Sequence, residues 1–158
     1  MQDAEKQRKP DKTDIGILRC LTENARMNAS QIGERVNLSV SAVIERMKKL
    51  ETTGLVRRYT AVIDEKQAGY DTQALISVRL ESPKFNESFA KQIRAHPAIM
   101  ECYYITGDFD YMTRVVTRSA EELTKVLNDI KDMPGVSLTR TYVVLENVKH
   151  RSSVLPEV

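Results

Sequence analysis

Residues 28–54, NASQIGERVNLSVSAVIERMKKLETTG, contain two helix starts separated by a short turn. Asn28 followed by Gln31 predicts a capping box, in which each side chain accepts a hydrogen bond from the other residue's backbone N–H. Asn37 stands where a left-handed residue would end this helix, and Ser39 is a good N-cap for the next one. Two capped helices joined by so short a turn predict a helix-turn-helix.

The second of these helices, expected over residues 40–52, has an apolar side and a polar side. The apolar residues that recur at helical spacing are expected to face the core: Val40, Val43, Ile44, Met47 and Leu50. In a helix-turn-helix, the N-terminal part of the second helix enters the major groove of DNA. The residues expected to contact base edges there are Ser39, Ser41, Ala42, Glu45 and Arg46. The residues expected to contact phosphates are Lys48, Lys49, Arg57 and Arg58. The alternative is a module of the same shape that contacts only protein.

The segments on either side complete a small domain. Asp11 with Asp14 predicts a capped first helix that runs to about Glu23. Residues 55–64, LVRRYTAVID, are rich in β-branched and aromatic residues and predict a wing strand. We therefore expect a disordered tail over residues 1–10, a winged helix-turn-helix domain over residues 11–60, and a linker strand or hinge over residues 61–71.

From residue 72 the pattern changes to that of a second domain. Strands are expected over residues 74–80, 99–105, 111–116 and 139–146, and helices over residues 86–95 and from Ser119 onward. The order strand-helix-strand-strand-helix-strand is that of a ferredoxin-like βαββαβ domain. We expect this domain over residues 72–148 and a tail over residues 149–158. The predicted fold class of the whole chain is α+β.

The sheet of this second domain needs cover on both faces. The two helices are expected to cover the face that carries Ala74, Ile76, Val78, Tyr142 and Val144. The other face, which is expected to include Leu75, Tyr104 and Val143, would meet a second copy of the chain and so give a C₂ homodimer.

Composition limits the class of protein and its location. The chain has 158 residues, of which 41% are hydrophobic and 29% are charged, and no apolar run approaches the ~20 residues that span a membrane. Its N-terminus lacks the apolar core of a secretory signal, so a cytoplasmic location without membrane attachment is expected. Residues 1–60 hold 12 Lys and Arg against 8 Asp and Glu, which makes this half a candidate for binding a polyanion. Cys20 and Cys102 are isolated and are expected to be small buried hydrophobes.

Signals of catalysis are missing from the sequence. It contains no phosphate loop, nucleophile elbow or HExxH motif, and His96 and His150 lack a sequence-level partner. Asp108 and Asp110 alone are too few ligands for a divalent metal. We expect a protein that is not an enzyme and that has no cofactor and no metal.

Several segments resemble the leucine-responsive regulatory protein and asparagine regulator (Lrp/AsnC) family over about residues 11–148. DKTDIGILRCL, the segment from Arg26 to Val56, and YTAVID are similar to its DNA-binding half, and ECYYITGDFDYM and MPGVSLTRTYVVLENVK to its C-terminal half. The resemblance implies a nucleoid-associated transcription regulator that binds double-stranded DNA. It also implies a homodimer that often assembles further, commonly into an octamer, and amino acids bound between the C-terminal domains.

The resemblance places an effector loop at Thr106, Gly107, Asp108 and Asp110, to which we add the neighbouring Tyr104. The chemistry agrees, because Gly107 lets the backbone approach a ligand and either Asp can pair with an α-ammonium group. The alternative is an ordinary hairpin turn, in which Gly and Asp are common. The match of GDFDY to leucine-responsive members favours a small, leucine-like amino acid.

Two other functions remain open at this point. The first is an architectural DNA-binding protein that has no effector and uses its C-terminal domain only for assembly. The second is an amino-acid-sensing regulatory subunit of an enzyme, against which the helix-turn-helix of residues 11–60 argues.

Overall fold

The computed structural model describes residues 9–157 and divides the chain into two compact units. One unit takes in the chain up to Val62 and again from His150, and the other is Ile63–Lys149. The disordered tail expected over residues 1–10 falls almost entirely outside the described residues. Of the helices in the described part of the chain, none is both long and apolar enough to cross a membrane.

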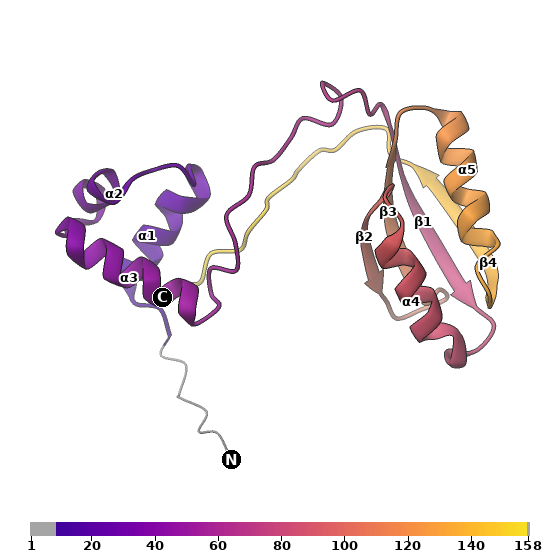
Figure 1. The fold of residues 1–158 in the computed structure, drawn as a ribbon, viewed down its shortest axis with the longest axis horizontal. Helices are drawn as coiled ribbons and strands as arrows, with labels where there is room; N and C mark the ends of the chain where they lie inside the picture. The colour runs from indigo at the N-terminus through magenta and orange to yellow at the C-terminus, as the bar shows by residue number, and fades with distance from the viewer. Residues whose placement is uncertain (1–8, 158) are drawn as a thin grey trace, which may run out of the picture. The chain divides into compact units, whose positions relative to one another are not determined.

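The first unit contains three helices, α1 (Lys12–Glu23), α2 (Ala29–Val36) and α3 (Val40–Thr52) (Figure 1). Both predicted capping boxes form, and the Ser39 hydroxyl accepts a hydrogen bond from the Ala42 N–H. Asn37 ends α2 in the left-handed conformation, with φ 55°. The helix-turn-helix is therefore confirmed together with its local hydrogen bonds.

The core of this unit contains fewer residues of α3 than the apolar pattern predicted. Its buried members are Ile17, Leu18, Cys20, Leu21, Ile32, Val43 and Leu50. The prediction that Val40 and Ile44 face the core is wrong, because both side chains are exposed. A Cβ at Gly33 would lie 2.6 Å from the Leu38 carbonyl oxygen, so the glycine lets the turn after α2 pack closely against the helix.

The wing strand predicted over residues 55–64 is wrong for the described structure. These residues are extended but pair with no strand, and most of their side chains are exposed. Tyr59 anchors the segment to α3 by donating its hydroxyl hydrogen to Glu51 over 2.8 Å. β-Branched residues favour a strand only where a neighbouring strand packs beside them, and the described chain supplies none here.

The C-terminal segment, which the sequence pattern left as a tail, contributes to the first unit. Leu155 is half-buried and packs against the helix-turn-helix core. Its neighbour Val154 points into solvent. The segment from His150 onward is therefore part of the first unit, although it lies at the opposite end of the chain.

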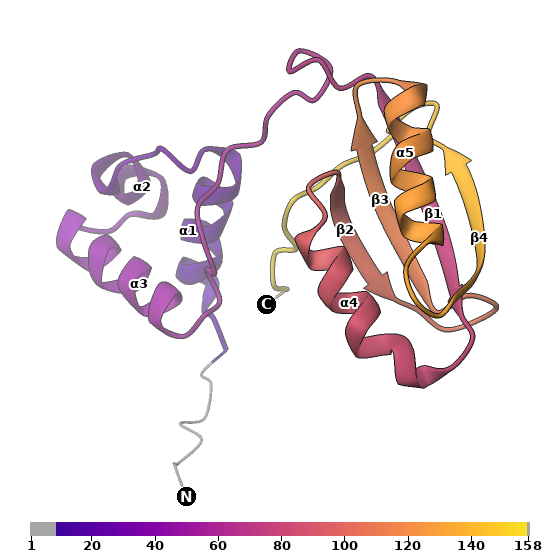
Figure 2. The same cartoon turned by 45° about the vertical axis from the view of Figure 1, so that its right-hand side comes forward.

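The second unit is a four-stranded antiparallel sheet with two helices. In chain order its elements are β1 (Thr72–Leu80), η1 (Pro83–Phe85), α4 (Asn86–Ala95), β2 (Ile99–Tyr104), β3 (Tyr111–Thr117), α5 (Ala120–Lys131) and β4 (Val136–Val143). The strands lie in the order β2-β3-β1-β4, and both helices lie on one face of the sheet (Figure 2). This is the predicted βαββαβ arrangement, and its core includes Ile76, Phe89 and Ile130.

The assignment of residues to the two faces was partly wrong. Leu75 pairs with Tyr142, which places Tyr142 on the face away from the helices, hereafter the open face. Val143 pairs with the buried Ala74 on the helix side, and Tyr104 pairs with Tyr111 there as well. Directly paired residues share a face, so a shift of one residue reverses the assignment of a whole strand.

Three smaller predictions about this unit also change. β4 begins three residues earlier than expected, and Val144 lies beyond its end. Cys102 is exposed rather than buried, because β2 is an edge strand. His96 has a partner, with its Nε2 3.3 Å from the Asp129 carboxylate.

Candidate DNA-binding and effector sites

One side of α3 presents an uninterrupted exposed strip of side chains. Ser41, Ile44, Glu45 and Lys48 recur at intervals of three and four residues and therefore share a face of the helix, hereafter the α3 ridge. The Ser39 and Ser41 hydroxyls lie 3.1 Å apart at the start of the helix. Lys49, Arg57 and Arg58 are also exposed, whereas Ala42 is half-buried.

Sequence reasoning missed the apolar part of this surface. Ile44 is 55% exposed in the middle of the α3 ridge, where an apolar side chain can contact a thymine methyl group. Its apolar character led to its assignment to the core. The available signal was spacing, because Ile44 shares an arc with Ser41 and Lys48.

Arg46 does not lie on the α3 ridge. Its Nη1 is 2.8 Å from Asp11 Oδ2 and 2.6 Å from Asp14 Oδ1, at the start of α1. The hydrogen bonds to Asp11 and then to Asp14 raise the pKa of Arg46. The pKa of Asp11 is lowered, first by the Asp14 backbone N–H and next by Arg46. In this arrangement the guanidinium holds α3 against α1 rather than pointing with the ridge, and its predicted base contact stays a prediction.

The predicted effector loop connects β2 to β3 and is fastened at its base. The Ile105 N–H donates to the Asp110 carbonyl oxygen over 2.8 Å, and the Asp110 N–H donates to the Val78 carbonyl oxygen over 3.0 Å. Asp110 Oδ2 accepts the Leu80 N–H over 2.7 Å. One oxygen of the Asp110 carboxylate therefore holds the end of β1, and its predicted pairing with an ammonium group stays a prediction.

The tip of the loop is exposed. Thr106, Gly107 and Asp108 lie together there, and Gly107 has φ 117°, which residues with a side chain rarely adopt. Apart from its two neighbours in the chain, no residue in the described part lies within 4 Å of the position that a Cβ of Gly107 would occupy. Tyr104 lies apart from them on the helix side of the sheet, with its ring centroid 5.0 Å from that of Tyr111.

Two arginines that the sequence analysis passed over contact this loop. The guanidinium carbons of Arg79 and Arg140 lie 5.4 Å and 5.3 Å from the centroid of the Phe109 ring. Arg79 Nε also donates to the Asp108 carbonyl oxygen over 2.7 Å. Strand alternation already placed Arg79 opposite the core-facing residues of β1, but only the pairing of β1 with β4 brings Arg140 to the same place.

The open face combines apolar side chains with an ionic network. Leu75, Met112, Val116 and Tyr142 lie on it. Arg114 donates to Glu65 over 3.0 Å and to Glu101 over 3.1 Å. The positive charge of Arg114 is therefore paired with two carboxylates of the same unit.

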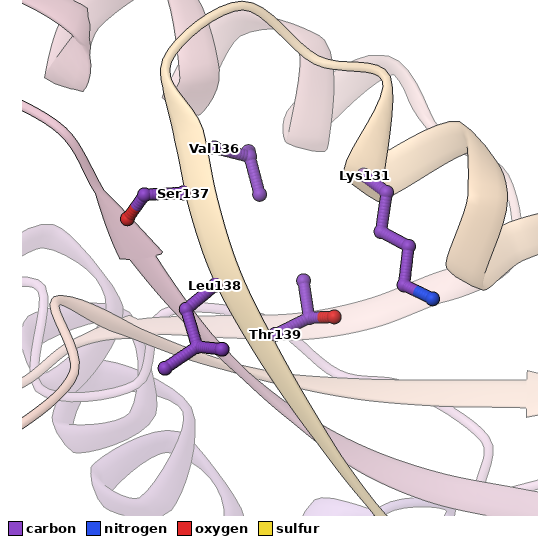
Figure 3. A pocket seen from close by; sticks show the side chains of 5 residues that line it. All are labelled: Lys131, Val136, Ser137, Leu138 and Thr139. Atoms are coloured by element: carbon purple, nitrogen blue, oxygen red, sulfur yellow. The ribbon is translucent and has the colours of Figure 1, made fainter.

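A separate hollow of about 380 Å³ lies beside β4 (Figure 3). Lys131 reaches it from the end of α5, and Val136 and Thr139 point to the same side of the strand as Lys131. Ser137 and Leu138 point to the other side. The lining includes none of the predicted effector residues, so the hollow is a feature of the free edge of the sheet.

Both units match known protein families. Residues 10–57 match the winged helix-turn-helix DNA-binding model, and residues 73–154 match the Lrp/AsnC ligand binding domain. The HTH-type transcriptional regulator FL11 of Pyrococcus horikoshii is 32% identical over 144 residues, which cover 91% of this chain and 95% of that protein. The leucine-responsive regulatory protein of Haemophilus influenzae is 33% identical over 142 residues, which cover 88% of this chain and 86% of that protein.

Solved structures of similar proteins lead to the same family. A transcriptional regulator of Neisseria meningitidis in complex with L-Met has a TM-score of 0.87 at 34% identity, covering 91% of this chain and 95% of that one. AsnC of E. coli has a TM-score of 0.86 at 28% identity, covering 92% and 98%. FL11 and the Neisseria protein are named as transcriptional regulators. The chain belongs to the Lrp/AsnC family of transcription regulators.

Proposed function

We propose that this regulator binds specific DNA sequences through the α3 ridge and changes its assembly or its DNA affinity when a small apolar amino acid binds at the loop tip. The observation that carries the proposal is that one chain combines an exposed, N-capped α3 with a firmly anchored, exposed Thr106–Asp108 turn in a separate unit. The arrangement supplies one surface for DNA and a second for a ligand.

The α3 ridge has the chemistry of major-groove contacts. Glu45 can accept a hydrogen bond from cytosine N4, Ser41 can bond to several bases, and Ile44 can contact a thymine methyl group. Lys48, Lys49, Arg57 and Arg58 are exposed around it and suit phosphates, which orient a protein on DNA. Binding to DNA would place the protein on the nucleoid, in the cytoplasm.

The open face supports a homodimer. Tyr142 is 48% exposed there opposite the apolar Leu75, and Met112 lies on the same face. An antiparallel sheet gains by burying such a face. A second copy that presents the same face would cover the part around Leu75 and Tyr142 with two-fold symmetry, and would leave the end of the face beside the Thr106–Asp108 loop open to a ligand. Two DNA-binding units in one dimer suit a DNA site with two half-sites. Octamers are proposed from family membership.

The effector proposal draws on chemistry and on the relatives. The Asp108 carboxylate is exposed and can pair with an α-ammonium group. One relative was solved as an L-Met complex and others are named leucine-responsive, so leucine and methionine are the first candidates.

The proposal is tested with the full-length protein and each of the twenty amino acids. A ligand that binds the native state raises the melting temperature, and its free-energy effect is about 2.7 kcal/mol at 100 times Kd. We expect an apolar amino acid to do so and to change the affinity for a DNA site selected from a random library. If no amino acid raises the melting temperature while selected DNA is still bound, the architectural function is correct instead.

A further inference from the structure

We infer that Arg79 and Arg140 form the receptor for the α-carboxylate of the effector, and that Phe109 holds them in place. This inference rests on the proposed function and deepens it. It assigns a role to two side chains outside the loop that the sequence analysis had identified.

The guanidinium groups of Arg79 and Arg140 both lie beside the Phe109 ring. Phe109 lies at 5.4 Å and 5.3 Å from the two guanidinium carbons, and the Arg79 Nε donates to the Asp108 carbonyl oxygen. Arg79 is thereby attached to the loop and Arg140 to the ring of the same loop. A planar guanidinium fixed in this way has donors left over and loses little entropy when it binds a carboxylate.

The positive charges of Arg79 and Arg140 are not paired with carboxylates of the described residues. Among the described residues, no carboxylate lies within ion-pair distance of Arg79 or Arg140, although Arg46 and Arg114 each contact two carboxylates. Two cations beside one ring repel each other, and an anion placed between them removes that repulsion. A carboxylate is the anion that an arginine binds with two parallel hydrogen bonds.

Asp108 and Leu138 lie close to Arg79 and supply the remaining parts of an amino-acid site. The carboxylate of Asp108 belongs to the residue whose carbonyl binds Arg79, so opposite charges lie within one residue's reach. Leu138 is directly opposite Arg79 in the sheet and is 43% exposed. The site therefore combines a carboxylate receptor, an ammonium partner and an apolar surface, and this fits a free α-amino acid with an apolar side chain.

The experiment is calorimetry on full-length protein with four probes. L-Leucine and L-methionine carry both charges, L-leucine methyl ester lacks the carboxylate, and 4-methylpentanoate lacks the ammonium group. The variants are Arg79→Gln and Arg140→Gln. Arg118→Gln is the matched control, because the Arg118 guanidinium lies 5.5 Å from the Tyr70 ring, away from the loop. Melting temperature and effector-free DNA binding show whether each variant is folded.

We expect Arg79→Gln and Arg140→Gln each to bind L-leucine or L-methionine about 10- to 100-fold more weakly, as for the loss of a charged hydrogen bond. The weak affinity for the methyl ester should change little, and Arg118→Gln should match the wild type.

Equal weakening of the amino acid and the ester would mean that the arginines only shape the loop, and unchanged affinity in both variants would exclude them altogether. In either case the proposed function stands and this inference falls. If the wild type binds no amino acid, both are wrong.

Discussion

Arg46 of α3 lies with its Nη1 2.6 Å from Asp14 Oδ1 of α1. The other oxygen of Asp14 accepts the Asp11 backbone N–H, and Asp11 divides its two oxygens in the same way between the Asp14 N–H and Arg46. The same two carboxylates thus begin α1 and orient α3. The helix that carries the α3 ridge is fixed by a contact on its opposite side.

Replacement of neighbouring α3 residues should separate orientation from base contact. Arg46→Ala should lower the free energy of unfolding by about 1 kcal/mol, since the ion pairs are partly solvent-screened, and should weaken binding to all DNA sequences alike. Glu45→Ala should leave stability within about 0.5 kcal/mol and change the preference at one base pair. Urea unfolding and selection from a random DNA library measure the two effects. A change of base preference in Arg46→Ala alone would restore its assignment as a base contact.

The Asp11 carboxylate should make the first unit sensitive to acid. Its pKa is lowered in the folded protein, so its charged form stabilises the fold above the ordinary pKa of 3.8, and this contribution is lost as pH falls through the folded value. Asp11→Asn keeps an N-cap but removes the charge. The wild type should be more stable than this variant at neutral pH, and the difference should shrink as the pH falls below 3.8. A difference that grows on acidification would contradict the sign.

Leu155 should stabilise the DNA-binding unit from the far end of the chain. Leu155→Ala should cost about 1–2 kcal/mol, less than the 2–5 kcal/mol of a fully buried leucine, because the side chain is half-buried. Val154→Ala is the control, since Val154 is exposed. Hydrogen exchange should show faster opening of α1 to α3 in the first variant. Equal protection in the two variants would show that Leu155 contributes nothing to the core.

Adjacent residues of β4 test the proposed dimer. Tyr142 lies on the open face and Val143 on the helix side, and the two are comparably exposed at 48% and 57%. Tyr142→Asp should produce monomers because it places a charge in the interface, whereas Val143→Asp should remain dimeric. Light scattering distinguishes the two states. A monomeric wild type would exclude the dimer, and dissociation only by Val143→Asp would move the interface to the other face.

Replacement of Asp108 and replacement of Asp110 should have different effects. Asp110→Ala removes the acceptor of the Leu80 N–H and should cost about 1–3 kcal/mol of stability. Asp108→Ala should change stability by no more than about 0.5 kcal/mol while abolishing the response to the amino acid. Thermal unfolding with and without ligand measures both. Similar stabilities of the two variants would mean that the Asp110 hydrogen bond is unimportant.

Helix caps and element order could be predicted from the sequence because their causes are local. The partners in each capping box are three residues apart, so Asp11 with Asp14 and Asn28 with Gln31 name the start of each helix directly. Alternation within β1 and the helical spacing of α5 likewise name the inward residues of each element. The loop at Thr106–Asp108 was found in the same way, as a turn between two strands.

The relations between elements could not be predicted in this way, because they depend on contacts between residues far apart in the chain. Alternation leaves two choices of face for β4, and its register on β1, with an irregularity at Arg79 and Leu80, selects one. The pairing of Arg46 with α1 and the packing of Leu155 require folded partners 32 or more residues away. Arg79 and Arg140 come together at the Phe109 ring only when β1 pairs with β4, since each is an ordinary surface arginine in its own strand.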